Sequence, residues 1–131
     1  MKYYFNGHFI IITNPVDVIS HFVYKLSGLS KNKIIGTGMA PDTARLRKTL
    51  SEMIKVDIKN IQAYVIGEHG DSQIIPWSLV TVGGKTLRQL FSDNKSRFDT
   101  VDKKNKKKII CSGWEIADVK GTTNFGISSY C

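Results

Sequence analysis

The sequence predicts an α/β fold that passes into an α+β fold towards its end. In the first half, short apolar runs alternate with segments of helical spacing, a pattern typical of parallel strands joined by helices. In the second half, the pair Gly83-Gly84 separates two short segments that read as the strands of an antiparallel hairpin. The chain has 131 residues, which is the size of one domain with a single core.

The first predicted strand and helix meet at a proline. Residues 9–12 are an apolar run, which we expect to form a buried strand ending at Thr13-Asn14-Pro15. Because proline cannot extend a central strand, Asn14 should lie at the carboxyl end of this strand. Helical spacing follows from residue 16 to residue 26, and Gly28 is expected to end the helix. The inner stripe of that helix should consist of Val16, Ile19, Val23 and Leu26.

A second strand and helix come next. Residues 33–35 read as a short strand that runs into Gly36-Thr37-Gly38. A helix is expected from Pro41 to about Lys55, since proline is favoured in a first helical turn. Apolar residues expected near its inner side are Ala44, Leu50, Met53 and Ile54.

The later elements are shorter. Residues 61–66 predict a strand, and the Gly83-Gly84 turn predicts a hairpin between residues 79–82 and 86–87. Residues 92–108 are polar and read as the start of an exposed helix. Residues 120–124 should form a loop that breaks the chain before a new helix.

Composition narrows the class of protein. No apolar stretch approaches the roughly 20 residues that span a bilayer, and the start of the chain does not resemble a secretory signal. The two cysteines, Cys111 and Cys131, lack the spacing of a CxxC motif. Reduced thiols in a cytoplasmic protein are therefore expected, with no membrane partner.

The net charge of +8 raises the alternative of a nucleic-acid-binding protein. Five of these charges come from the lysines between residues 103 and 108, and the remainder is +3 (8 − 5). A local run of this kind is more typical of a solvated surface than of a basic face that binds nucleic acid. We expect no nucleic-acid partner.

The candidate catalytic group is His69. It stands in Gly67-Glu68-His69-Gly70-Asp71, directly after a predicted strand, where the flanking glycines leave room for a small substrate. An imidazole exchanges protons near neutral pH, and a carboxylate on its far nitrogen would hold the protonated form. Asp42 is a candidate for that carboxylate, although Glu68 and Asp71 are closer in sequence. The alternative is that His69 is an ordinary turn residue.

Arg45 is the candidate anion-binding group. Its guanidinium can hold a carboxylate by two parallel hydrogen bonds, and it shares a helix face with Asp42, three residues earlier. The alternative is a surface ion pair at a helix start, with Asp42 favoured there by the helix dipole. Arg47 points roughly 200° away from Arg45 and should serve another surface or none.

Two other kinds of site are disfavoured. Gly36-Thr37-Gly38 follows a strand and precedes a helix, as a dinucleotide fingerprint would, but Pro41 occupies the third glycine position. Glu68, His69 and Asp71 lack a second histidine or a thiolate at metal-binding spacing. We therefore expect no metal.

Several motifs together resemble the L-lactate and malate dehydrogenase family, in its order and spacing. The resemblance covers nearly the whole chain and is weakest in residues 92–108. Its motifs are Thr13-Asn14-Pro15-Val16-Asp17, Ile35-Gly36-Thr37-Gly38, Asp42-Thr43-Ala44-Arg45, Gly67-Glu68-His69-Gly70-Asp71, Trp77-Ser78, Gly83-Gly84 and Lys120-Gly121-Thr122-Thr123.

This resemblance implies NAD-dependent interconversion of a 2-oxo acid and its L-2-hydroxy acid. By match to the family, His69 would give a proton to the substrate carbonyl and Asp42 would hold that histidine. Arg45 would bind the substrate carboxylate. Asn14 would contact the substrate carbonyl and, with Thr13, the cofactor, and the bond into Pro15 is expected to be cis. Thr123 matches a position that helps to select the substrate side chain.

Details favour the lactate type over the malate type. Glu68 and Trp77 are similar to lactate-type members, and residues 112–116 and 71–73 resemble L-2-hydroxyisocaproate dehydrogenases. Pyruvate or a larger aliphatic 2-oxo acid is the expected substrate.

Some residues depart from the family pattern. Pro41 replaces an aliphatic pocket residue of the family. Arg47 matches a position used for an allosteric sugar phosphate, but Gln62 replaces its usual histidine, so no activation is expected.

The resemblance also sets expectations for domain organisation. Residues 1–15 would be the last strand of a Rossmann-type NAD-binding domain, and residues 16–131 most of the substrate domain. The chain would then be a fragment without the N-terminal nucleotide-binding half and the C-terminal end, and inactive by itself. The intact family member would be a homo-oligomer, either a dimer or a tetramer. The alternative is a non-catalytic remnant, or a fragment that docks on an intact subunit.

Overall fold

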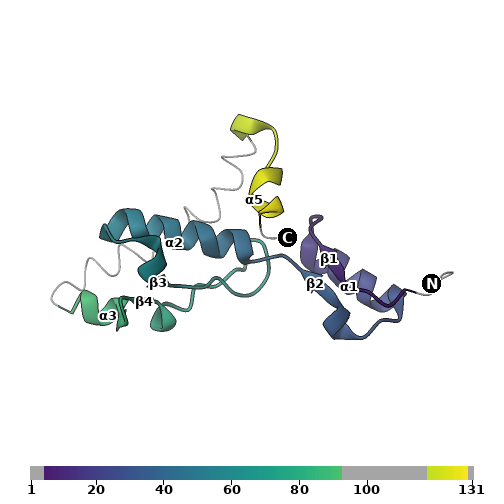
Figure 1. Ribbon diagram of the computed structural model, residues 1–131, viewed down its shortest axis with the longest axis horizontal. Helices are drawn as coiled ribbons and strands as arrows, with labels where there is room; N and C mark the ends of the chain where they lie inside the picture. The colour runs from purple at the N-terminus through teal and green to yellow at the C-terminus, as the bar shows by residue number, and fades with distance from the viewer. Residues whose placement is uncertain (1–4, 93–117, 130–131) are drawn as a thin grey trace.

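The computed structural model describes residues 5–92 and 118–129 (Figure 1). Two units follow each other along these residues, a parallel strand pair with one helix and a longer helix packed on a small antiparallel sheet. The elements are β1 (Phe9–Ile11), α1 (Val16–Ser27), β2 (Ile34–Gly36), α2 (Ala40–Ile54), β3 (Ile61–Gln62), β4 (Thr81–Val82), β5 (Lys85–Thr86), α3 (Leu87–Leu90) and α5 (Asn124–Ser128). Single 3-10 turns lie at Lys31–Lys33, Ile58–Asn60 and Trp77–Leu79.

The first unit is a parallel pair covered by α1 on one face. Ile11 of β1 lies opposite Gly36 of β2, and a Cβ atom on Gly36 would stand 2.9 Å from the Ser20 hydroxyl of α1. The glycine therefore lets α1 lie close against the strands. As predicted, α1 ends just before Gly28, which has the left-handed φ of 70°.

The predicted burial of the first strand is wrong for half of its side chains. Ile11 faces α1 and is buried, but Ile10 and its neighbour Ile35 on β2 are 52% and 48% exposed. The reason is that α1 covers only the face that carries Ile11. The prediction that Leu26 belongs to the inner stripe of α1 is also wrong, since this side chain is 79% exposed in the last turn of the helix.

The second unit contains the main core. Helix α2 begins with Pro41 in its first turn and ends before Lys55, which has a left-handed φ of 62°. Leu46 and Leu50 of α2 are fully buried against the small sheet. Met53 and Ile54 pack at the edge of this core, as predicted. The buried core residues are Leu46, Leu50, Ile61, Ala63, Val65, Ile75, Val80, Val82 and Leu87.

The strand predicted for residues 61–66 is shorter than expected. Residues 61, 63 and 65 are buried and alternate with exposed residues, but the ladder with β4 covers only Ile61 and Gln62. After Gln62, side chains of α2 form hydrogen bonds with the backbone in place of a neighbouring strand. Arg47 Nε donates to the Ala63 carbonyl oxygen at 3.0 Å, and the Val65 amide donates to Thr43 Oγ1 at 3.1 Å. These groups therefore need no partner strand.

The predicted hairpin is confirmed around Gly83-Gly84, where β4 pairs antiparallel with β5. Leu79 lies in a 3-10 turn instead of the strand, and residue 87 begins α3, which is capped reciprocally by Thr86 and Gln89. The predicted break at residues 120–124 is also confirmed, since Gly121 has a φ of 70° and α5 begins at Asn124. Helix α5 contacts α2 (Figure 1). The polar helix predicted for residues 92–108 falls outside the described residues from 93 onwards.

Candidate active site

The first two turns of α2 carry two predicted site residues on one face. Asp42 is 2% exposed, and its Oδ1 atom lies 2.9 Å from Nη1 of Arg45, one turn later. A buried carboxylate is unfavourable unless its oxygens find hydrogen-bond partners. The positive end of the helix dipole at this position favours the negative charge of Asp42 further.

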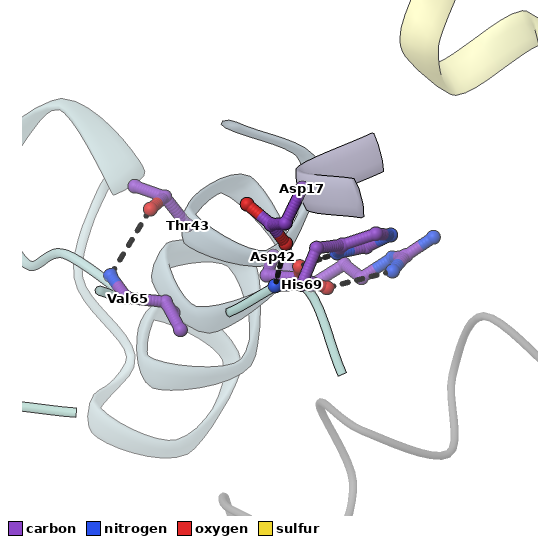
Figure 2. Close-up of polar contacts among 6 residues, drawn as sticks. Asp17, Asp42, Thr43, Val65 and His69 are labelled. Carbon is purple, nitrogen blue, oxygen red and sulfur yellow. Dashed lines mark hydrogen bonds and ion pairs between the residues drawn. The ribbon is translucent and has the colours of Figure 1, made fainter. Parts of the chain in front are cut away.

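The second oxygen of Asp42 contacts the predicted catalytic histidine. Oδ2 lies 2.6 Å from Nδ1 of His69, which comes from a loop 27 residues later (Figure 2). Gly67, with a φ of 100°, turns the chain into this loop. Glu68, one of the alternative partners, instead accepts a hydrogen bond from Ser72. The residue patterns alone left the carboxylate partner of His69 open, and the geometry assigns it to Asp42.

A third carboxylate holds the main chain of this loop. Asp17, in the first turn of α1, accepts a hydrogen bond from the His69 backbone N–H at 2.9 Å. Figure 2 shows Asp17 and Asp42 both directed at His69, one from α1 and the other from α2. No residue pattern in the sequence predicted this contact, which joins residues 52 positions apart. Asp17 belongs to the same motif as Asn14, three residues earlier, but that motif does not indicate its partner.

The surroundings of His69 favour its protonated form. The hydrogen bond to Asp42 raises the pKa of His69 above its ordinary value, and the negative charges of Asp42 and Asp17 add to this effect. Burial of the ring and the positive charge of Arg45 act in the opposite direction without cancelling it. With Nδ1 engaged by Asp42, Nε2 is the ring nitrogen left to exchange a proton with a ligand.

An open cavity of about 80 Å³ brings most of the predicted site residues together. Its lining residues are Ile12, Asn14, Val16, Thr37, Gly38, Pro41, Arg45, His69, Thr123, Gly126 and Ile127. Four of the predicted site residues line it, and Asp42 lies directly behind His69.

The β1–α1 junction contributes one side of this cavity. The peptide bond between Asn14 and Pro15 is cis, as predicted, and Asn14 lines the cavity. Thr13, predicted to contact a cofactor, is not among the lining residues. Thr37 and Gly38 do line it, and Thr37 Oγ1 donates to the Ile11 carbonyl oxygen at 3.1 Å. The sequence assigned no site role to these two residues, although they belong to the rejected dinucleotide fingerprint and to a motif of the family resemblance.

The described residues hold no cluster of three or more side chains suited to a metal ion. Nor does any helix in residues 5–92 and 118–129 have the length and apolar character to cross a membrane. The lysine run and both cysteines lie outside these residues.

Comparisons of the sequence with a family model and with known proteins all indicate the same family. The family model described as "lactate/malate dehydrogenase, alpha/beta C-terminal domain" matches residues 41–129. L-lactate dehydrogenase 3 of Bacillus anthracis is 49% identical over 126 residues, which are 95% of this chain and 40% of the relative. L-lactate dehydrogenase of Fusobacterium nucleatum is 42% identical over 128 residues, or 97% of this chain and 40% of the relative. The chain thus spans about two fifths of the length of these relatives.

Solved structures agree with the sequence comparison. An L-lactate dehydrogenase from Clostridium thermocellum superposes with a TM-score of 0.82 at 39% identity, covering 98% of this chain and 41% of that protein. The minor L-lactate dehydrogenase of Enterococcus mundtii, solved with bound ligands, gives a TM-score of 0.83 at 34% identity, covering 94% and 39%. From the matched family domain, these relatives and the shared fold, we conclude that the chain belongs to the lactate/malate dehydrogenase family.

Proposed function

We propose that this chain carries the substrate-binding side of an NAD-dependent L-2-hydroxyacid dehydrogenase of the lactate type. The reaction interconverts a 2-oxo acid and its L-2-hydroxy acid. The observation that carries the proposal is the cluster in which the buried carboxylate of Asp42 contacts both His69 and Arg45 beside a small cavity. Such a cluster offers one cation for a carboxylate and one proton donor for a carbonyl, which are the two groups of a 2-oxo acid.

Arg45 is the residue proposed to bind the substrate carboxylate. Asp42 contacts only Nη1 of the Arg45 guanidinium, which has five N–H donors in all. The side chain is 24% exposed and lines the cavity, where the other donors can bind a ligand. A guanidinium can hold a carboxylate by two parallel hydrogen bonds, which fixes the orientation of the substrate as well as its position. The contact with Asp42 restricts the side chain before the substrate arrives.

His69 is the residue proposed to move the proton. During reduction of a 2-oxo acid, Nε2 would donate its proton to the carbonyl oxygen, and in the reverse direction it would accept the proton of the hydroxyl. Asp42 holds the ring through Nδ1 and stabilises its positive charge. Asn14, which also lines the cavity, is proposed to hold the same substrate oxygen through its amide group.

The position of the cavity fits a nicotinamide cofactor. In α/β sheets, nucleotides bind in the crevice outside the carboxyl ends of the strands. The cavity lies there, since Ile12 and Asn14 follow β1, and Thr37 and Gly38 follow β2. When bound, NAD(H) would supply or accept the hydride at the substrate carbon. Thr13 and Asn14 are the residues proposed to contact it, and residues 1–15 are assigned to its domain, with residues 16–131 forming the substrate domain.

The cavity lining favours a substrate with one carboxylate. Within the described part of the chain, Arg45 is the only lysine or arginine among the lining residues, whereas a dicarboxylic substrate would need a second cation. Pro41 and Ile127 present apolar surface instead, and Thr123 adds a hydroxyl. We therefore propose pyruvate or a larger aliphatic 2-oxo acid as the substrate.

Direct binding tests the proposal without requiring turnover. The chain would be titrated with pyruvate, 2-oxoisocaproate and oxaloacetate near pH 6 while the ring signals of His69 are followed by NMR. We expect both monocarboxylates to shift these signals and oxaloacetate to bind more weakly. His69→Gln identifies the signals by their loss. Tighter binding of oxaloacetate, or no response to any of the three acids, would contradict the proposal.

A further inference from the structure

We propose that Asp17 is a positioning residue for His69, which it holds by the main chain while Asp42 holds the ring. This inference rests on the proposed function, because it assigns a supporting residue to the same proton donor. The contact is the 2.9 Å hydrogen bond from the His69 backbone N–H to Asp17 Oδ2, which joins residues 52 positions apart.

The loop that carries His69 needs an external support. Gly67 and Gly70 stand on either side of the Glu68–His69 pair, and glycine restricts the backbone less than any other residue. Hydrogen bonds within the loop include Gly70 N–H to the Glu68 carbonyl oxygen at 2.9 Å, but this bond does not involve His69. The Asp17 carboxylate restrains the residue whose ring must face the cavity.

The two carboxylates reach His69 from different units of the fold. Asp17 lies on α1, which packs on β1 and β2, while Asp42 lies on α2, which packs on the small antiparallel sheet. Both anchors are needed to fix the ring, because a bond to Nδ1 alone still leaves the main chain free to move. Asp17 also follows Asn14 by three residues, and Asn14 and His69 both line the cavity, so the same contact ties the chain segments of two lining residues together.

Asp17 contributes charge as well as geometry. The charged groups that face His69 are Asp17 from α1 and Asp42 and Arg45 from α2. The charge of Asp17 raises the pKa of His69, although less than the hydrogen bond that His69 donates to Asp42 does. Asp17 is exposed, so solvent and salt screen this contribution.

A simpler explanation is that Asp17 only favours the start of α1 through the helix dipole. The two explanations differ in what happens at His69. A dipole role requires the charge but no contact with His69, whereas a positioning role requires an acceptor oxygen. Asp17→Asn keeps an oxygen acceptor and removes the charge, while Asp17→Ala removes both.

The test measures His69 directly by NMR, through its ring pKa, its ring tautomer and the exchange rate of its amide proton. Asp17→Ala should lower the pKa, populate the second tautomer and accelerate amide exchange at His69 by tenfold or more. Asp17→Asn should lower the pKa by less and leave the tautomer and the exchange rate near those of the unmodified chain.

Thr43→Val is the matched control. It removes a similar bond, from the Val65 backbone N–H to Thr43 Oγ1 at 3.1 Å (Figure 2). We expect faster exchange at Val65 with no change at His69. Unchanged His69 behaviour in Asp17→Ala, or equal changes in Asp17→Ala and Thr43→Val, would overturn the inference. Should Asp17→Ala fail to fold, Asp17→Asn provides the test. If Asp17→Asn also fails to fold, or if its His69 ring no longer keeps the tautomer of the unmodified chain, the inference is overturned.

These readouts separate the inference from the proposed function. If the His69 signals respond to Asp17→Ala but not to any 2-oxo acid, the positioning contact stands and the proposed substrate is wrong. If pyruvate binds normally to Asp17→Ala and the His69 tautomer is unaltered, the proposed function stands and the positioning role is wrong.

Discussion

Arg47 donates from Nε to the carbonyl oxygen of Ala63 at 3.0 Å, and so joins α2 to the chain segment that follows β3. The same guanidinium lies 5.0 Å from the centre of the Tyr64 ring. Arg47 points away from Arg45, as predicted, but it does not serve a free surface. Its contacts replace the ladder hydrogen bonds that a longer β3 would have made.

Arg47→Ala should therefore destabilise the fold without altering the candidate active site. The loss of a charged hydrogen bond and of the ring contact corresponds to roughly 2–4 kcal/mol in the free energy of unfolding. Urea unfolding followed by circular dichroism would measure it. Lys48→Ala, at an exposed neighbouring position, is the control and should change stability by no more than ~0.5 kcal/mol. Equal effects of the two substitutions would contradict a role for the Ala63 contact.

Asp42→Asn should lower the pKa of His69. The hydrogen bond and the charge of Asp42 are what raise it, and burial and Arg45, which lower it, would remain. An NMR titration of the His69 ring would report the change. A His69 pKa that stays raised in this variant would mean that a group other than Asp42 stabilises the protonated ring.

The same pair should make stability depend on pH. Because the folded-state pKa of His69 is raised, the stabilisation is complete below the unfolded value of about 6.5 and is lost as the pH rises through the folded value. Urea unfolding of the unmodified chain between pH 5 and 9 should show this decline. The decline should be smaller in Asp42→Asn, and an identical pH profile for both proteins would exclude the pair as its cause.

Arg45→Lys should weaken binding of 2-oxo acids about tenfold or more. Lysine keeps the positive charge but cannot form two parallel hydrogen bonds with a carboxylate, and a hydrogen bond to a charged group contributes ~1.5–3 kcal/mol. Calorimetric titration with pyruvate would measure the affinity. Arg47→Lys is the matched control, since it makes the same change outside the cavity and should leave the affinity unaltered. Full affinity in Arg45→Lys would exclude a two-pronged carboxylate contact.

Ser20→Ala should stabilise the first unit. The Ser20 hydroxyl is buried without a hydrogen-bond partner among the described residues, and alanine is the better helix former. The expected gain in the free energy of unfolding is up to ~1 kcal/mol, measured by thermal or urea unfolding.

Gly36→Ala should instead lower the free energy of unfolding by ~1–3 kcal/mol, because the added Cβ meets the Ser20 hydroxyl at 2.9 Å. The double variant should recover much of that loss, and purely additive effects would contradict the steric explanation.

Local patterns in the sequence predict the elements better than they predict the contacts between them. Pro15, Gly28 and Gly83-Gly84 mark element ends correctly, because the restrictions of proline and the freedom of glycine act within a few residues. The exposed Ile10 was not foreseeable in this way. Its burial depends on which elements cover the sheet, and a run of isoleucines does not carry that information.

The candidate site shows the same division. The residues of the site were found from short motifs, but spacing could not choose among Asp42, Glu68 and Asp71 as the partner of His69. The family resemblance and the folded geometry both select Asp42, 27 residues away. Asp17 was missed because its contact joins residues 52 positions apart, and no local pattern reports such a contact.

The shared carboxylate of Asp42 has a consequence for the summed charge of the three side chains that it joins. With His69 protonated, Asp42, His69 and Arg45 sum to +1 (−1 + 1 + 1), and one bound carboxylate brings the sum to zero. An anion in the cavity should therefore favour proton uptake by His69, and the proton should in turn favour the anion. Between the His69 pKa values of the free and the anion-bound protein, binding of an anion would take up a proton from the solvent, so that the ligand itself protonates the proton donor.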